Sequence, residues 1–92
     1  MKIERTSQFL KDYKRLKKKY RDMTKLRTVI DLIVEGDSET LSRRYKNHHL
    51  HGQYKSYQEC HIEPDWLLIY KIDKKKLTLI LTRTGSHDDL FK

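Results

Sequence analysis

A short turn between two strand-like segments most restricts how this chain can fold. The turn is Glu63-Pro64-Asp65. It suits a tight reversal because the proline ring fixes the backbone φ angle and aspartate favours turn positions. Residues 54–61 and 66–72 flank it and have the composition of strands, so we expect a β-hairpin. The turn should bring three side chains to one end of a sheet, namely His61, Asp65 and Trp66.

Two amphipathic helices are expected before the hairpin. Apolar residues recur every three or four positions over 9–20 and again over 23–34, which is the spacing of one helix face. Thr6 or Ser7 and then Asp22 suit the N-caps, and Gly36 suits a C-terminal cap. With so short a break between them, the two helices should form an antiparallel hairpin. The opposite face of the first helix is basic: Lys11, Lys14, Arg15, Lys17, Lys18, Lys19 and Arg21.

The remaining segments complete an α+β pattern. Residues 2–6 could form a short strand, and residues 39–44 a short helical turn. A last strand is expected over 77–82, after a polar loop at 73–75. We therefore predict a single domain over residues 1–92, with an N-terminal helical hairpin packed on a small antiparallel β-sheet.

The charge of the chain indicates its kind of partner. The net charge is +8, which favours an anionic partner such as nucleic acid or an acidic protein. The longest apolar runs, 66–70 and 77–81, are far shorter than the about 20 residues that span a bilayer. The N-terminus lacks the apolar stretch of a signal peptide, and one cysteine allows no internal disulfide. We expect a cytoplasmic protein that does not bind membranes.

Histidine is concentrated in the second half of the chain, between positions 48 and 87. A lone imidazole is usually a surface or packing group, but here the combination matters. The predicted sheet could gather four groups from separate segments: His48, His61, Asp65 and His87. A metal site is not expected, because Cys60 and His61 are adjacent and would face opposite sides of a strand.

Such a set of groups matches the needs of RNA cleavage. RNA carries its own nucleophile, the 2′-hydroxyl, so a base, an acid and a cation suffice. Arg83, after the last expected strand, supplies a cation. Aromatic residues that look exposed could stack on bases: Tyr54, Tyr57, Trp66 and Phe91, although Trp66 could equally be a core residue.

Several segments together resemble the YafQ branch of the RelE toxin superfamily. The resemblance covers nearly the whole chain. It rests on Tyr45-Lys46-Asn47-His48, on Cys60-His61-Ile62-Glu63-Pro64-Asp65-Trp66 with the strand after it, on Arg83-Thr84-Gly85-Ser86-His87, and on Leu90-Phe91.

The resemblance implies the toxin of a bacterial type II toxin–antitoxin module, with a RelE-like fold. It implies a ribosome-dependent endoribonuclease that cuts mRNA without metal or cofactor. By position, His48, His61, Asp65 and His87 would be catalytic, Trp66 and Phe91 would support the site or the substrate, and Arg83 would contact a phosphate. The implied partners are an acidic, partly disordered antitoxin, the 70S ribosome and mRNA, with operator DNA bound only through the antitoxin complex.

Two questions stay open at this level. The segment Asn47-His48-His49-Leu50 lacks the proline usual for the family after the first histidine, so His49 or His51 could replace His48. His87 is our candidate acid, with His48 or His61, assisted by Asp65, as base. The competing functions are a ParE-like inhibitor of DNA gyrase, which needs no histidine cluster, and a basic nucleic-acid-binding co-repressor.

Overall fold

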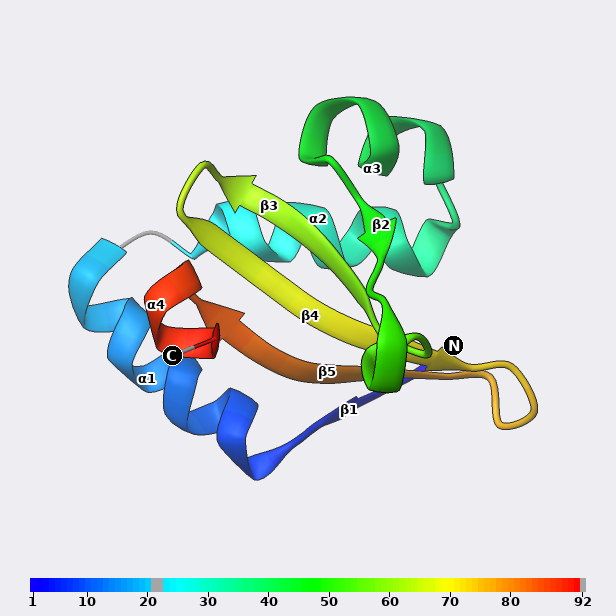
Figure 1. Cartoon of the computed structure of the whole chain (residues 1–92), viewed down its shortest axis with the longest axis horizontal. Coiled ribbons are helices and arrows are strands. Elements are labelled where there is room, and N and C mark those ends of the chain that lie inside the picture. The colour runs from blue at the N-terminus through cyan, green and yellow to red at the C-terminus, as the bar shows by residue number, and fades with distance from the viewer. Residues whose placement is uncertain (21–22, 92) are drawn as a thin grey trace.

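The computed structural model describes residues 1–20 and 23–91, and it confirms the α+β class. Figure 1 shows a twisted sheet with α2 behind it and the short helix α4 nearer the viewer than α1. In chain order the elements are β1 (Lys2–Arg5), α1 (Ser7–Tyr20), α2 (Thr24–Glu35), α3 (Ser38–Tyr45), β2 (His48–His49), the 3₁₀ turn η1 (Gly52–Tyr54), β3 (Gln58–Glu63), β4 (Trp66–Asp73), β5 (Thr78–Gly85) and α4 (His87–Phe91).

The sheet is mixed rather than antiparallel throughout. Its strand order is β1-β5-β4-β3-β2. β1 runs parallel to β5, while the other neighbouring strands are antiparallel. The expected antiparallel sheet is therefore wrong at the β1 edge. The direction of β1 depends on its partner, which is the last strand of the chain, and no local pattern in the sequence reports that pairing.

Helix ends form where the sequence places caps. Thr6 Oγ1 accepts the main-chain N–H of Phe9 at 3.0 Å and donates to the Thr82 carbonyl at 2.7 Å, so it starts α1 and ties it to β5. Gly36 closes α2 with a left-handed φ of 73°. The cap expected at Asp22 lies outside the described residues.

The hydrophobic core lies between the helices and one face of the sheet. Phe9 and Leu16 of α1 and Val29 of α2 join it from the helices. From the sheet, β4 contributes the side chains that alternate along one of its faces: Trp66, Leu68 and Tyr70. No helix in the described part of the chain is long and apolar enough to cross a bilayer.

Trp66 is a core residue, so of the two expectations for its side chain, exposed for stacking or buried in the core, the second is confirmed. Its relative exposure is 0%. Its Nε1–H donates to Thr84 Oγ1 at 3.0 Å, which joins β4 to β5 inside the core. The indole therefore supports the sheet from within. The sequence alone does not reveal this, because an uninterrupted apolar strand does not show which of its side chains face the core.

Candidate active site

The sheet face turned away from the core carries the titratable side chains, and we call it the open face. Side chains alternate along a strand, and paired residues on neighbouring strands share a face. Since Trp66, Leu68 and Tyr70 face the core, their neighbours in β4 face the other way. Two rows cross this face: Glu59, Ile69 and Arg83 in one, and His61, Leu67 and Gly85 in the next.

Two imidazoles on the open face share one carboxylate oxygen. The Nε2 atom of His48 lies 3.5 Å, and that of His61 3.6 Å, from Oε1 of Glu59. The Glu59 side chain is only 5% exposed. His48 Nδ1 lies 2.8 Å from the Lys46 carbonyl, which can only accept, so Nδ1 donates there. Proton exchange at His48 is thereby left to Nε2, beside the carboxylate.

The strand register distinguishes His48 from its neighbour. His48 pairs with Glu59 in the β2–β3 ladder, while His49 pairs with Gln58 and so faces the opposite side. The His48 and His61 ring centroids are 6.5 Å apart. The geometry therefore brings together His48, Glu59 and His61, and it does not bring His49 to this cluster.

Glu59 is the residue that the sequence reasoning missed. The available signal was its spacing from His61, because residues two apart on a strand share a face. We had expected Asp65 beside these histidines. Asp65 instead accepts the main-chain N–H of His87 at 3.2 Å, at the start of α4.

His87 and Phe91 lie together on α4. Their ring centroids are 5.1 Å apart, and both side chains are exposed. α4 begins two residues after Gly85, which ends the row that contains His61. The sequence did not predict this helix. It places an imidazole and an accessible aromatic ring at the end of the open face.

Arg83 is held by a buried partner. Its Nε donates to Oδ2 of Asp12 at 2.8 Å, and its Nη2 donates to Oδ1 at 3.3 Å. These hydrogen bonds raise the pKa of the guanidinium, so Arg83 is a fixed positive charge. Adjacent strands lie about 4.8 Å apart, so the Arg83 backbone is about 10 Å from that of Glu59.

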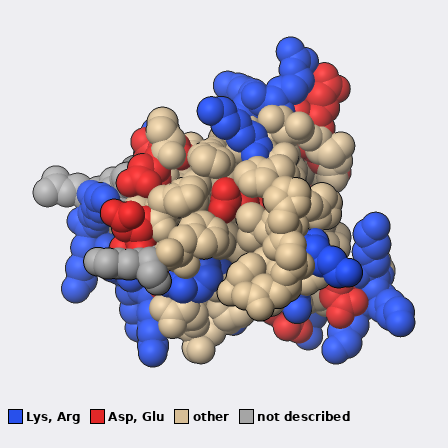
Figure 2. All heavy atoms as spheres, viewed as in Figure 1, with Lys and Arg blue, Asp and Glu red and all other residues tan. Residues whose placement is uncertain are grey.

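The surface in front of the sheet is largely uncharged. Figure 2 shows a broad tan area over the middle of this face, with Lys and Arg gathered toward its margins. Among the described residues, no three His, Cys, Asp or Glu side chains are grouped as metal ligands. Cys60 is fully buried, and burial raises the pKa of its thiol to about 12, so it takes no part in proton transfer.

The fold defines this chain as a protein of the RelE-like class. The family model described as "Bacterial toxin of type II toxin-antitoxin system, YafQ" matches residues 1–92, and the chain belongs to that family.

Several similar proteins match this chain over almost its whole length. The mRNA interferase toxin YafQ of Escherichia coli K12 is 42% identical over 89 residues, covering 97% of this chain and 94% of that protein. YafQ in the crystal structure of the E. coli DinJ–YafQ complex superposes with a TM-score of 0.84 at 40% identity, over 98% of this chain and 97% of the other. A toxin from Helicobacter pylori, described as metal-bound, gives a TM-score of 0.87 at 41% identity, over 99% of each chain.

Proposed function

We propose that this chain is an endoribonuclease that cleaves mRNA by acid/base catalysis on the open face. The observation that carries the proposal is the pair of imidazoles, His48 and His61, that share one oxygen of Glu59. The name mRNA interferase, borne by the E. coli relative, agrees with it. Two imidazoles beside one carboxylate are suited to proton transfer.

The base step takes place at an imidazole Nε2. His61 or His48 removes the proton of a 2′-hydroxyl, and the oxygen attacks the adjacent phosphorus. The Glu59 carboxylate lies within 3.6 Å of both Nε2 atoms and favours the imidazolium that forms. Asp65 has a positioning role in this scheme, because it holds the backbone of His87 rather than a proton-carrying ring.

The acid step is assigned to His87. As the P–O5′ bond breaks, the imidazolium of His87 gives its proton to the leaving 5′-oxygen. The products are a 2′,3′-cyclic phosphate and a 5′-hydroxyl, so atoms and charges balance. Arg83 offsets the added charge on phosphorus through Nη1. Within the described part of the chain, this nitrogen has no hydrogen-bond partner. Phe91, which is 48% exposed, supplies a ring for base stacking.

The mRNA is proposed to be cut on translating 70S ribosomes, which places the protein in the cytoplasm. The charge of +8 suits a site surrounded by ribosomal RNA, since each phosphate contact adds to affinity. Tyr54, before β3, extends the exposed aromatic surface: it is 52% exposed and packs edge-on to the partly buried Tyr57, and Lys71 Nζ lies 5.1 Å from the centre of the Tyr57 ring. A mixed aromatic and cationic surface of this kind binds single-stranded RNA.

The second proposed partner is an acidic, partly disordered antitoxin. A groove of about 690 Å³ lies between α1 and α2; its lining includes Phe9, Tyr13 and Ile30, with Lys17 and Arg27 among its charged residues. An amphipathic segment with acidic flanks fits such a groove, and it would order on binding. Operator DNA would then be bound through the antitoxin. Arg27→Glu should weaken the complex with a co-expressed antitoxin, while Lys74→Glu, in a distant loop, should not.

A cell-free translation assay with a defined mRNA tests the nuclease. Primer extension maps new 5′ ends for the wild type, His61→Ala and His87→Ala. We expect cuts that need translating ribosomes and that disappear in both variants. Intact mRNA with the wild-type protein would overturn the proposal, and a DNA gyrase supercoiling assay would then test the inhibitor alternative.

A further inference from the structure

A buried carboxylate accepts a main-chain N–H at an edge of the sheet, next to the open face. β1 ends at Arg5, opposite Leu81, while β5 runs on to Gly85. Asp12 of α1 fills this position: its side chain is 0% exposed and its Oδ2 accepts the main-chain N–H of Thr84 at 3.2 Å. A carboxylate so buried requires strong partners, because removing its charge from water is unfavourable.

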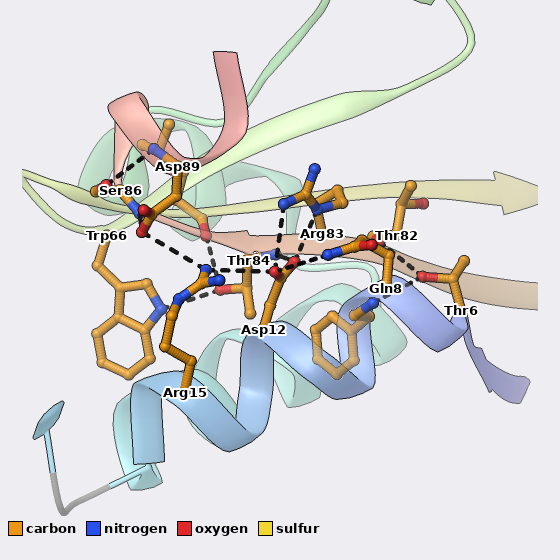
Figure 3. Close-up of polar contacts among 12 residues, drawn as sticks. Thr6, Gln8, Asp12, Arg15, Trp66, Thr82, Arg83, Thr84, Ser86 and Asp89 are labelled. Atoms are coloured by element: carbon orange, nitrogen blue, oxygen red, sulfur yellow. Dashed lines mark hydrogen bonds and ion pairs between the residues drawn. The ribbon is translucent and has the colours of Figure 1, made fainter. Parts of the chain in front are cut away.

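Two arginines compensate this charge from different elements. Arg83 donates to both oxygens of Asp12, as described above, and Arg15 Nη2 donates to Oδ1 at 3.3 Å. The same Arg15 nitrogen lies 3.5 Å from Oδ2 of Asp89 in α4. Figure 3 shows the Arg15 guanidinium between the two carboxylates, with Arg83 on the other side of Asp12. Arg15 therefore links a buried residue of α1 to α4.

Asp89 in turn fixes the first turn of α4. Its Oδ2 accepts the main-chain N–H of Ser86 at 3.2 Å, and Ser86 Oγ accepts the N–H of Asp89 at 3.1 Å. This reciprocal pair is a capping box, and it encloses His87. The hydrogen bonds from Ser86 hold the pKa of Asp89 below its usual value, with a smaller contribution from Arg15. Asp89 is thus an anion that can pair with Arg15.

Gly85 leaves the space that this bridge needs. A Cβ at Gly85 would lie 3.1 Å from Arg15 Nη2 and 3.2 Å from Asp89 Oδ2. The φ angle of 154° is also one that other residues rarely adopt. A side chain at this position would strain the backbone and press on the contact between Arg15 and Asp89.

α4 depends on such polar contacts because it has little else to hold it. It has five residues, and none of them is buried. A helix of this length is unstable alone in water. Its orientation, and therefore the position of the His87 ring, is set by Asp65 on one side and by Asp89 with Arg15 on the other.

We propose that Arg15 is a positioning residue for the cleavage reaction: anchored on buried Asp12, it holds Asp89 and thereby keeps His87 at the open face. This inference rests on the proposed nuclease function. Lys19 of the same helix also lowers the pKa of Asp89 through its charge, while the Arg15 guanidinium contacts both Asp12 and Asp89. The alternative is that Arg15 binds RNA through its charge alone, and the test must distinguish this from a positioning role.

Two substitutions with opposite changes in charge separate these roles. Arg15→Gln removes the cation, and Asp89→Asn removes the anion while its side-chain oxygen can still cap Ser86. A positioning role predicts that both variants lower kcat by about 10- to 100-fold with KM little changed, as expected for a displacement of about 1 Å. The double variant should lose no more than the worse single one. Arg15→Lys should recover part of the loss.

An electrostatic role predicts a different result: Arg15→Gln would raise KM, and Asp89→Asn would lower it or leave activity unchanged. That outcome would overturn the inference. Lys74→Gln is the matched control, since it also removes one exposed positive charge. Asp89→Asn leaves the bonds of Asp12 in place, so it keeps the test valid if Arg15→Gln unfolds the protein.

An NMR measurement on the free protein tests the positioning without any assay of cleavage. The main-chain N–H of His87, which is bonded to Asp65 Oδ1, should exchange slowly with solvent in the wild type and in Lys74→Gln, and faster in Arg15→Gln and Asp89→Asn. Slow exchange in both variants contradicts the inference. If the wild type shows slow exchange but cuts no mRNA, the nuclease proposal fails while the structural role of Arg15 stands.

Discussion

Oδ1 of Asp65 accepts the main-chain N–H of His87 at 3.2 Å, so the turn between β3 and β4 holds the first residue of α4. The Pro64 turn therefore acts on the imidazole of His87 through the backbone. Asp65 and Glu59 have separate tasks: one holds a helix, and the other lies between two histidine rings.

Substitutions at Asp65 should depend on whether an acceptor oxygen remains. Asp65→Asn keeps the oxygen that accepts from His87 and should retain cleavage within about 10-fold, since a neutral acceptor weakens such a bond without removing it. Asp65→Ala should lose about 100-fold or more. Cleavage rates on translating ribosomes test this, and equal losses in the two variants would mean that Asp65 carries a proton.

His48 and His49 should respond differently to the same substitution. His48→Ala removes an imidazole from beside Glu59 and should lower cleavage by about 100-fold or more. His49→Ala is the matched control, because this adjacent imidazole faces the other side of β2 and is also exposed to solvent. Primer extension with both variants decides between them. A larger loss in His49→Ala would contradict the proposed role of His48 in proton transfer.

Glu59→Gln should lower kcat more than it changes KM. The amide has the same shape, but it has no charge to offset an imidazolium at His48 or His61. We expect a fall of about 10- to 100-fold, smaller than for removal of a proton-transferring group. Single-turnover cleavage measures it. A pure increase in KM would indicate that Glu59 acts in substrate binding instead.

Trp66→Phe should affect stability rather than catalysis. The change removes the 3.0 Å bond to Thr84 and leaves a small cavity, at a cost of about 1–3 kcal/mol in the free energy of unfolding. Urea denaturation measures this. Phe91→Ala is the comparison, since that ring is 48% exposed and should contribute little to stability while its loss weakens cleavage. An unchanged midpoint for Trp66→Phe would contradict its place in the core.

Acid should release α4 before it unfolds the core. The hydrogen bonds from Ser86 lower the pKa of Asp89 below its usual value of about 3.8, so the folded helix binds this proton less readily than the released one. The stabilisation is present above that value and is lost as the pH falls through the lowered pKa. The ring contact between His87 and Phe91, followed by NMR from pH 5 downward, should show this step. Asp89→Asn should lack it.

Much of the fold follows from local signals in the sequence. The turn at Pro64 lies between two strands as predicted, and β4 begins at Trp66 as expected; β3 covers Gln58–Glu63 instead of the expected 54–61. Gly36 and Thr6 mark helix ends because capping chemistry is local. The direction of β1 could not be predicted in this way, since it depends on a partner at the other end of the chain.

The site was only partly predictable. The register that places His48 opposite Glu59 depends on how β2 and β3 pair, and two residues of β2 give little pattern to read. Ser86 and Asp89 have the spacing of a capping box, which is a usable signal for α4. The contact between Arg15 and Asp89 joins segments far apart in the chain, and the basic composition of α1 conceals it.

The edge of β5 beyond β1 also limits how this protein can associate with extended chains. An uncovered strand edge is a template for pairing with a strand of another molecule. Here the N–H of Thr84 is already bonded to Asp12, and the arginines on that carboxylate crowd the same edge. A partner that adds a strand must therefore do so along the outer strands, β1 or β2, so that complex formation by strand addition leaves the support of α4 undisturbed.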